Sequence, residues 1–305
     1  MASTKGQHHI VESPVRRRPS GGSLPPPEYD FGHGANTDFS KLHLDASTST
    51  ESLPQYESAV QGEASSSHST IAFEATNTFQ IDAQGHPLFA LPICPRPDPI
   101  PIYSVLPTGQ TGPLLYQSIR AKRRSGNCIL VRESDESTVC STTYRFGPNR
   151  PPSIRLLGDV ARDEAFEVRS KGCHTRAQNM STHLGTFQWR YASRAERKAV
   201  GASSLLILDI VTIISVASGK QEERRQPVAH FIRNEAFRTQ GTGASTAGNG
   251  GRLLVDLRPW FDTKNEAQQA EVFAIASCLS MLKKEVDRRR RHQLIVIAAG
   301  ASGGC

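Results

Sequence analysis

The sequence predicts a mainly β protein, in which an antiparallel β-barrel surrounds one central hydrophobic helix near the C-terminus and a disordered N-terminal tail precedes the barrel. Three observations predict this fold: short β-prone runs between about residues 70 and 258, one stretch without Gly or Pro at 265–291, and a polar first part of the chain. We expect a disordered tail over residues 1–69, a barrel domain over 70–298 and a flexible C-terminus over 299–305.

The first 70 residues differ from the rest of the chain in charge and composition. They hold five basic and eight acidic side chains, whereas the full 305-residue chain carries a net charge of +7, which leaves +10 for residues 71–305. The tail is rich in Ser, Pro, Gly, Thr and His and has few large apolar residues. Such a segment cannot bury enough apolar surface to offset its ordering entropy, so we predict disorder.

Short β-prone runs separated by turn residues follow the tail. Several alternate apolar and polar residues, which is typical of strands in an antiparallel barrel or sandwich. Phe187, Trp189 and Tyr191 alternate with polar residues, so we expect them on the core face of one strand. The expected strands are residues 71–74, 78–81, 88–91, 102–105, 114–116, 128–132, 139–146, 154–157, 165–168, 187–191, 205–216, 228–237 and 253–257, with 294–298 as one more short strand.

Residues 265–291 are expected to form the central helix, because their apolar residues recur at helical spacing. Between Val272 and Leu282 these side chains go almost all the way round, so the helix must be enclosed on most sides. Asp262 or Thr263 can cap its start, and the arginines at 288–291 complement the negative end of its dipole. About eleven apolar residues are too few to cross a membrane but suit the inside of a barrel.

Several classes of protein are excluded by what the sequence lacks. There is no run of about eighteen apolar residues and no apolar signal region at the N-terminus, so we expect neither a spanning helix nor secretion. The six cysteines lie far apart, which indicates reduced thiols, and no zinc-ligand spacing is present. We therefore expect a cytoplasmic protein without a cofactor, with a peripheral-membrane or a nuclear location as the alternatives.

Two strings that resemble catalytic motifs lack the context that catalysis needs. The G-x-S-x-G string around Ser302 has no following helix and no triad partner after it, and the S-x-x-K string from Ser280 to Lys283 lies in the middle of the expected helix. The glycine-rich segment 241–251 lacks the Lys-Ser/Thr pair of a phosphate-binding loop, so we expect a flexible loop there. We expect no enzymatic activity.

The order of elements resembles the tubby C-terminal-like fold, which tubby proteins, LURP-one-related proteins and phospholipid scramblases share. The stretches TFQWRY at 186–191, RAERK at 194–198 and LLILD at 205–209 are similar to uncharacterised fungal proteins of this group. The resemblance covers roughly residues 70–292. It implies that residues 70–258 form a barrel of about twelve strands and that residues 266–290 form the helix inside it.

Two proline-tyrosine elements lie in the expected tail. One matches P-P-x-Y, the peptide that WW domains bind: its prolines hold a polyproline II helix before binding, and its tyrosine fills an adjacent pocket. The other has the looser form L-P-x-Y. We predict that both bind a WW-domain protein, with HECT-type ubiquitin ligases as the family-level expectation, and chance occurrence in a Pro-rich tail is the alternative. The residues concerned are Pro26, Pro27, Tyr29, Leu53, Pro54 and Tyr56.

A third element of the tail is a candidate for regulation. Arg17 and Arg18 stand before Pro19 and Ser20 in the form R-R-x-S, which basic-directed kinases recognise. A phosphate on Ser20 would offset the neighbouring arginine cluster. An unmodified basic patch is the alternative.

Basic clusters give the expected barrel domain its positive charge. For any single cluster, a solvated face or a helix end is the simpler interpretation. The resemblance favours a second interpretation, contact with an anionic membrane lipid. Binding of nucleic acid is the third interpretation and is less favoured than these two, because no zinc-finger, helix-turn-helix or RNP pattern is present. The expected lipid contacts are Lys122, Arg123, Arg124, Arg194, Arg197 and Lys198.

These inferences combine into one functional expectation. We expect a monomeric, non-enzymatic, intracellular adaptor whose tail binds a WW-domain protein and whose barrel meets an anionic lipid or a protein. The alternative is a lipid-handling, scramblase-like or transcription-related protein of the tubby-like group.

Overall fold

The computed structural model of this chain describes residues 72–302 except positions 95, 123–124, 145–149, 158–164, 173–174, 216–220 and 264. All of the described residues belong to one compact unit, Ser66–Cys305. In chain order, its elements are β1 (Asn77–Ile81), β2 (Ile100–Val105), β3 (Thr111–Ile119), β4 (Cys128–Arg132), β5 (Thr138–Thr143), β6 (Ser153–Leu156), β7 (Ala165–Glu167), β8 (Arg169–Ser170), β9 (Gln178–Thr182), β10 (Gly185–Tyr191), α1 (Arg194–Ala199), β11 (Ser204–Ser215), β12 (Gln221–Arg233), β13 (Gly251–Val255), the short 3₁₀ helix η1 (Arg258–Trp260) and α2 (Glu266–Ser302).

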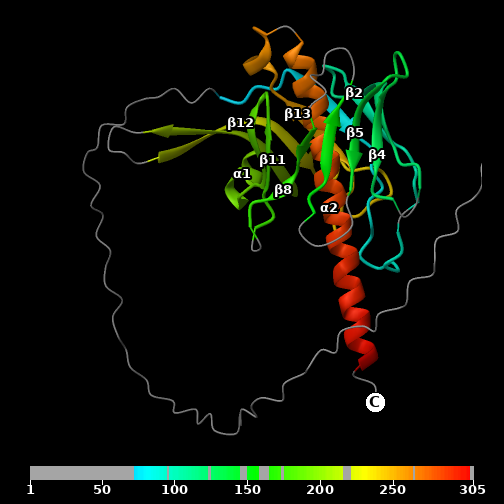
Figure 1. The fold of residues 1–305 in the computed structure, drawn as a ribbon. Coiled ribbons are helices and arrows are strands. Elements are labelled where there is room, and N and C mark those ends of the chain that lie inside the picture. Colours follow the sequence, from blue (N-terminus) through cyan, green and yellow to red (C-terminus); the bar gives the residue numbers. More distant parts are fainter. Residues whose placement is uncertain are drawn as a thin grey trace, which may run out of the picture. The chain divides into compact units, whose positions relative to one another are not determined.

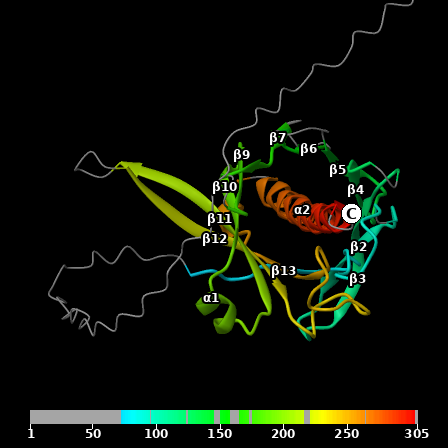
Figure 2. The ribbon, with the colours of Figure 1, turned by 90° about the horizontal axis from the view of Figure 1, so that it is seen from below.

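The strands form one antiparallel sheet that curls around α2. Among the described residues the sheet has 13 strands in the order β7-β6-β5-β4-β3-β2-β1-β13-β12-β11-β10-β9-β8. β7 also contacts β9, so the two ends of the sheet lie side by side and the barrel is nearly closed. Figure 2 looks along α2 and shows the strands encircling it. The predicted antiparallel barrel around one C-terminal helix is therefore confirmed.

The buried part of α2 provides the centre of the core. Every residue from Val272 to Leu282 is buried, as the apolar residues all round this segment predict. Phe273 lies between two aromatic rings of the barrel wall, with its ring centroid 5.2 Å from that of Phe166 and 4.5 Å from that of Phe187. Close aromatic packing of this kind adds to the stabilisation that burial alone gives.

Strand β10 confirms the predicted alternation of side chains. Phe187 and Trp189 are fully buried and face α2, and the indole N–H of Trp189 donates a hydrogen bond of 2.9 Å to the hydroxyl of Ser277. That bond satisfies a polar group that burial would otherwise leave without a partner. Tyr191, on the same face of β10 as Phe187 and Trp189, is half-buried at the end of the strand, and its hydroxyl donates a hydrogen bond to Glu285 of α2.

Three expectations about local structure are wrong. Residues 72–74 and 88–91 are not strands, and residues 88–91 form an exposed loop between Pro87 and Pro92, which both interrupt strand pairing. The segment 241–251 is a loop that leads into β13, as expected, but it is packed against α2 rather than flexible: Gly248 adopts a positive φ of 68°, and a Cβ there would lie 2.5 Å from Cγ2 of Val286. Only glycine permits this close approach.

The C-terminal end of α2 also differs from the expectation. Residues 294–298 are helical rather than a strand, and the helix includes residues 299–302, which the sequence places in the flexible C-terminus. Helical hydrogen bonds continue here because no proline removes a donor, and Gly300 alone is not enough to end the helix. Within the part of the chain that the structure describes, no helix is long and apolar enough to cross a membrane.

A pair of isoleucines on α2 tests the enclosure of the helix. Ile275 is 0% exposed in the core, whereas Ile295 is 59% exposed. Ile275→Ala removes buried methyl groups and leaves a cavity, so we expect a loss of about 2–5 kcal/mol in the free energy of unfolding. Ile295→Ala, the matched control, should change it by no more than about 0.5 kcal/mol. Urea denaturation measures both, and equal effects would contradict the enclosure of α2.

Candidate functional site

The candidate site lies where α2 leaves the core. The apolar segment ends at Leu282, and the next turns of the helix are polar and basic, with four consecutive arginines at 288–291. Successive residues of an α-helix are rotated by about 100°, so these four side chains point to all sides of α2. The first three are half-buried against the end of the barrel, and Arg291 is exposed.

A cavity of about 280 Å³ opens beside this part of α2, between β10, β12 and the loop that follows β12. Its lining is mostly polar and strongly basic. Five arginines and one histidine line it, with one carboxylate among them. The ionisable residues of this cavity are Arg176, Arg233, Arg238, Glu285, Arg288, Arg289 and His292.

The one carboxylate of the cavity is already neutralised by one of the arginines. The guanidinium of Arg233 donates to both oxygens of Glu285, at 2.7 and 2.8 Å, and the two side chains are 6% and 12% exposed. Glu285 also accepts hydrogen bonds from the hydroxyl of Tyr191 and the backbone N–H of Gly248. Burial raises the pKa of Glu285, but the hydrogen bonds and charge of Arg233 outweigh it, so the pKa lies below 4.5 and the carboxylate stays ionised.

The remaining arginines leave an excess of positive charge. Among the described residues, none of Arg176, Arg238, Arg288 and Arg289 makes an ion pair. The Nη1 atom of Arg289 is buried with no hydrogen-bond partner in this part of the chain. Burial and, to a smaller extent, the charge of Arg288 lower the pKa of the neighbouring Lys284 to about 8. These groups repel one another, so an anion bound in the cavity would be stabilised.

A second cavity, of about 500 Å³, adjoins the first through Arg176 and Tyr191. The guanidinium carbon of Arg176 lies 5.7 Å from the centre of the Tyr191 ring, within the range of a cation–π contact. Arg197 of α1 also lines this cavity. The two cavities therefore connect α1 to the basic end of the barrel.

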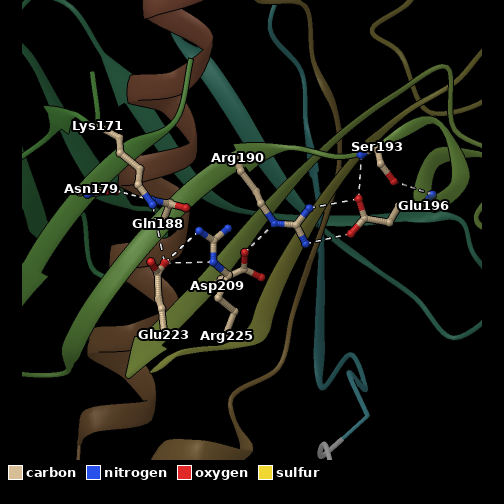
Figure 3. Close-up of polar contacts among 9 residues, drawn as sticks. All are labelled: Lys171, Asn179, Gln188, Arg190, Ser193, Glu196, Asp209, Glu223 and Arg225. Carbon is tan, nitrogen blue, oxygen red and sulfur yellow. Dashed lines mark hydrogen bonds and ion pairs between the residues drawn. The ribbon is translucent and has the colours of Figure 1, made fainter. Parts of the chain in front are cut away.

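Helix α1 is held in place by the polar network of Figure 3. Ser193 and Glu196 form a capping box at its start. Glu196 also accepts hydrogen bonds from Arg190 at 2.8 and 3.1 Å, and the Nε of Arg190 lies 2.7 Å from Asp209. The hydrogen bond from Arg190 is the main reason why the pKa of Glu196 falls to about 2. Arg190 is thus occupied by two carboxylates, and Arg194 and Lys198 of α1 are exposed.

The structure places the sequence-predicted lipid contacts in different surroundings. Arg194 and Lys198 are exposed on α1, and half-buried Arg197 donates to the backbone oxygen of Ser203. Lys122 is exposed between β3 and β4, and it lines neither basic cavity. Arg123, Arg124, Ser20 and the six residues of the proline-tyrosine elements lie outside the described residues.

Sequence reasoning missed most of the basic cavity. Arg233 and Glu285 are 52 positions apart, and no local pattern connects them. Arg176 and Arg238 stand alone in polar segments. Helix α1 did have a detectable signal, because Ser193 and Glu196 match the S-x-x-E pattern of a capping box.

Comparison with known proteins gives no relative for this chain. The sequence matches no family model, and neither the curated proteins nor the solved structures provide a match. The functional conclusion therefore depends on the site itself.

His230 on β12 lies close enough to Arg190 and Glu196 for their charges to affect its pKa. Its ring stacks on Phe73 with centroids 3.9 Å apart. Burial and, to a smaller extent, the charge of Arg190 lower the pKa of His230 from 6.5 to about 4, and the charge of Glu196 opposes this shift only in part. Between these two pH values the unfolded chain binds a proton at His230 that the folded protein does not, so stability falls as the pH drops through this window.

We expect His230→Phe to reduce this loss of stability. Phenylalanine keeps the stacking on Phe73 and has no titratable group, so the free energy of unfolding should decline less between pH 6.5 and about 4 than in the wild type. Urea denaturation of both proteins across this range measures the difference. If the two pH profiles are parallel, His230 is not held neutral by its surroundings.

Proposed function

We propose that this protein is a non-enzymatic adaptor that binds anionic membrane lipids through the basic end of its barrel and recruits a WW-domain protein through its N-terminal segment. The observation that carries the lipid half is the cavity of five arginines whose one carboxylate is already paired. Phosphate groups match the planar donors of guanidinium, so lipid headgroups are suitable ligands. Each basic residue near an anionic surface contributes about 1 kcal/mol.

Membership of the tubby C-terminal-like group is part of this proposal. The order of elements, thirteen described strands followed by one enclosed apolar helix, supports it. The exposed cations Arg194 and Lys198 on α1 and Lys122 after β3 are proposed as additional lipid contacts outside the two cavities. HECT-type ubiquitin ligases are the proposed source of the WW domain.

Vesicle flotation tests lipid binding. The wild type should float with phosphatidylcholine vesicles that contain about 30 mol % phosphatidylserine at about 0.15 M salt, and not with vesicles of phosphatidylcholine alone. Arg238→Ala with Arg289→Ala leaves the pair of Arg233 and Glu285 intact and removes two charges from the cavity. We expect the partition coefficient to fall about 30-fold.

A matched control removes two charges elsewhere. Arg224 and Arg225 are exposed on β12, in the hairpin that projects away from α2 in Figure 1. Arg224→Ala with Arg225→Ala changes the net charge equally and should bind nearly as well as the wild type. Equal losses in both double variants would show that only net charge matters, and binding that ignores phosphatidylserine would refute the proposal.

The adaptor half has a separate test. Tyr29→Ala with Tyr56→Ala removes the side chain that fills the tyrosine pocket of a WW domain in each element, so capture of the full chain by an immobilised WW domain should be lost. Phe31→Ala with Phe39→Ala, two aromatic changes outside the elements, is the control. Unchanged capture of the tyrosine variant would refute the adaptor role and leave lipid binding unaffected.

A further inference from the structure

The final turns of α2 are exposed and apolar. Figure 1 shows this end of the helix continuing beyond the strands. Four consecutive large side chains, from Leu294 to Ile297, are between 53% and 70% exposed. Because four consecutive helical residues cover all sides of a helix, no single face could be buried by tilting α2 against the barrel.

A second exposed apolar group lies beside the first. Phe89 is 95% exposed in the loop between β1 and β2, and the other large apolar residues of that loop are also exposed. Gln293 of α2 holds this loop: its amide donates to the backbone oxygen of Leu88 at 2.9 Å, and its Oε1 is 2.9 Å from the ring of His86. We call the combined surface the apolar tip; it consists of Leu88, Phe89, Leu91, Ile93, Leu294, Ile295, Val296 and Ile297.

The apolar tip follows directly after the basic cavity along the helix axis. At a rise of about 1.5 Å per residue, Leu294 stands about 5 Å beyond Arg291, and the helix continues for a further 12 Å or so to Ser302. Arg290 also contacts the loop of the tip, through the sulfur of Cys94 at 3.1 Å. The molecule therefore presents, in order along one axis, a buried core, a ring of arginines and an exposed apolar end.

This order matches the layers of an anionic bilayer surface. Amphipathic elements that bind membranes bury their apolar part by about 5–10 Å below the headgroups, with basic residues at headgroup level. The apolar turn from Leu294 to Ile297 rises by about 5 Å, which is within that depth, and it is far shorter than the roughly 20 residues that a spanning helix needs. Eight exposed large apolar side chains gathered at one end of a molecule are typical of an interaction site.

We propose that the apolar tip inserts into the interfacial layer of an anionic membrane, so that the arginines of the cavity meet the lipid phosphates. This inference depends on the proposed lipid binding and adds its orientation: α2 points into the membrane and the start of α2 faces away. A second copy of the chain fits less well, because a symmetric contact between two tips would bring two sets of arginines at 288–291 close together.

Tryptophan fluorescence tests the insertion directly. The two native tryptophans, Trp189 and Trp260, are buried in the core and give a constant background. Phe89→Trp adds a probe in the tip, and Phe261→Trp, at an exposed phenylalanine just before the start of α2, is the matched control at the opposite end of the helix. Vesicles contain about 30 mol % phosphatidylserine and lipids with a doxyl group high on the acyl chain.

The two proposals give different outcomes. We expect the added fluorescence of Phe89→Trp to shift to the blue and to be quenched by the doxyl lipid, with no change for Phe261→Trp. If the protein floats with these vesicles but Phe89→Trp is not quenched, insertion is refuted and lipid binding stands. If the protein does not float at all, both are refuted.

A second variant distinguishes the membrane from a second copy of the chain. Val296→Asp leaves every arginine of the cavity in place and puts a charge into the tip. We expect about a tenfold or greater loss of vesicle binding and an unchanged mass in solution. If the wild type is instead a dimer that Val296→Asp converts to a monomer, with vesicle binding unaffected, the tip is an interface between copies and the inference is wrong.

Discussion

The enclosure of α2 is the constraint on which the remaining structure depends. A helix that is apolar on every side from Val272 to Leu282 cannot lie on a surface, because any exposed face would leave several large side chains in water. A single sheet can cover all sides of such a helix only by curling round it. Polar atoms that are buried inside the barrel need hydrogen-bond partners there. The hydrogen bond from Trp189 of β10 to Ser277 of α2 is an example in which the sheet and the helix satisfy each other's polar groups.

The end of the enclosure determines what this fold offers for function. Where α2 emerges, its side chains change from apolar to charged, and the buried pair of Arg233 and Glu285 joins β12 to α2 at this level. A buried charge is tolerated only when it is compensated, and one carboxylate can compensate only one arginine. The other arginines therefore stand around the helix with their charge available, between the core on one side and the exposed apolar turns on the other.

The sequence allowed the prediction of features that come from local patterns. The helix was predictable from the spacing of its apolar residues, and β10 from the alternation of Phe187 and Trp189. The pairing of Arg233 with Glu285 was not, because it depends on how β12 and α2 meet in three dimensions. Residues 88–91 and 294–298 show the opposite error: both are β-prone, yet strands need neighbours to pair with, and neither segment has one in the described structure.

The position of α2 after all the strands affects how the chain reaches its fold. The ribosome releases the described strands before the residues that fill the barrel, so the newly made sheet has no core to close around until α2 follows. Its apolar inner face and its unpaired strand edges then resemble the surfaces that drive aggregation. Nascent chains of this protein therefore expose these surfaces until α2 has been synthesised, and truncation before α2 removes the core rather than an appendage.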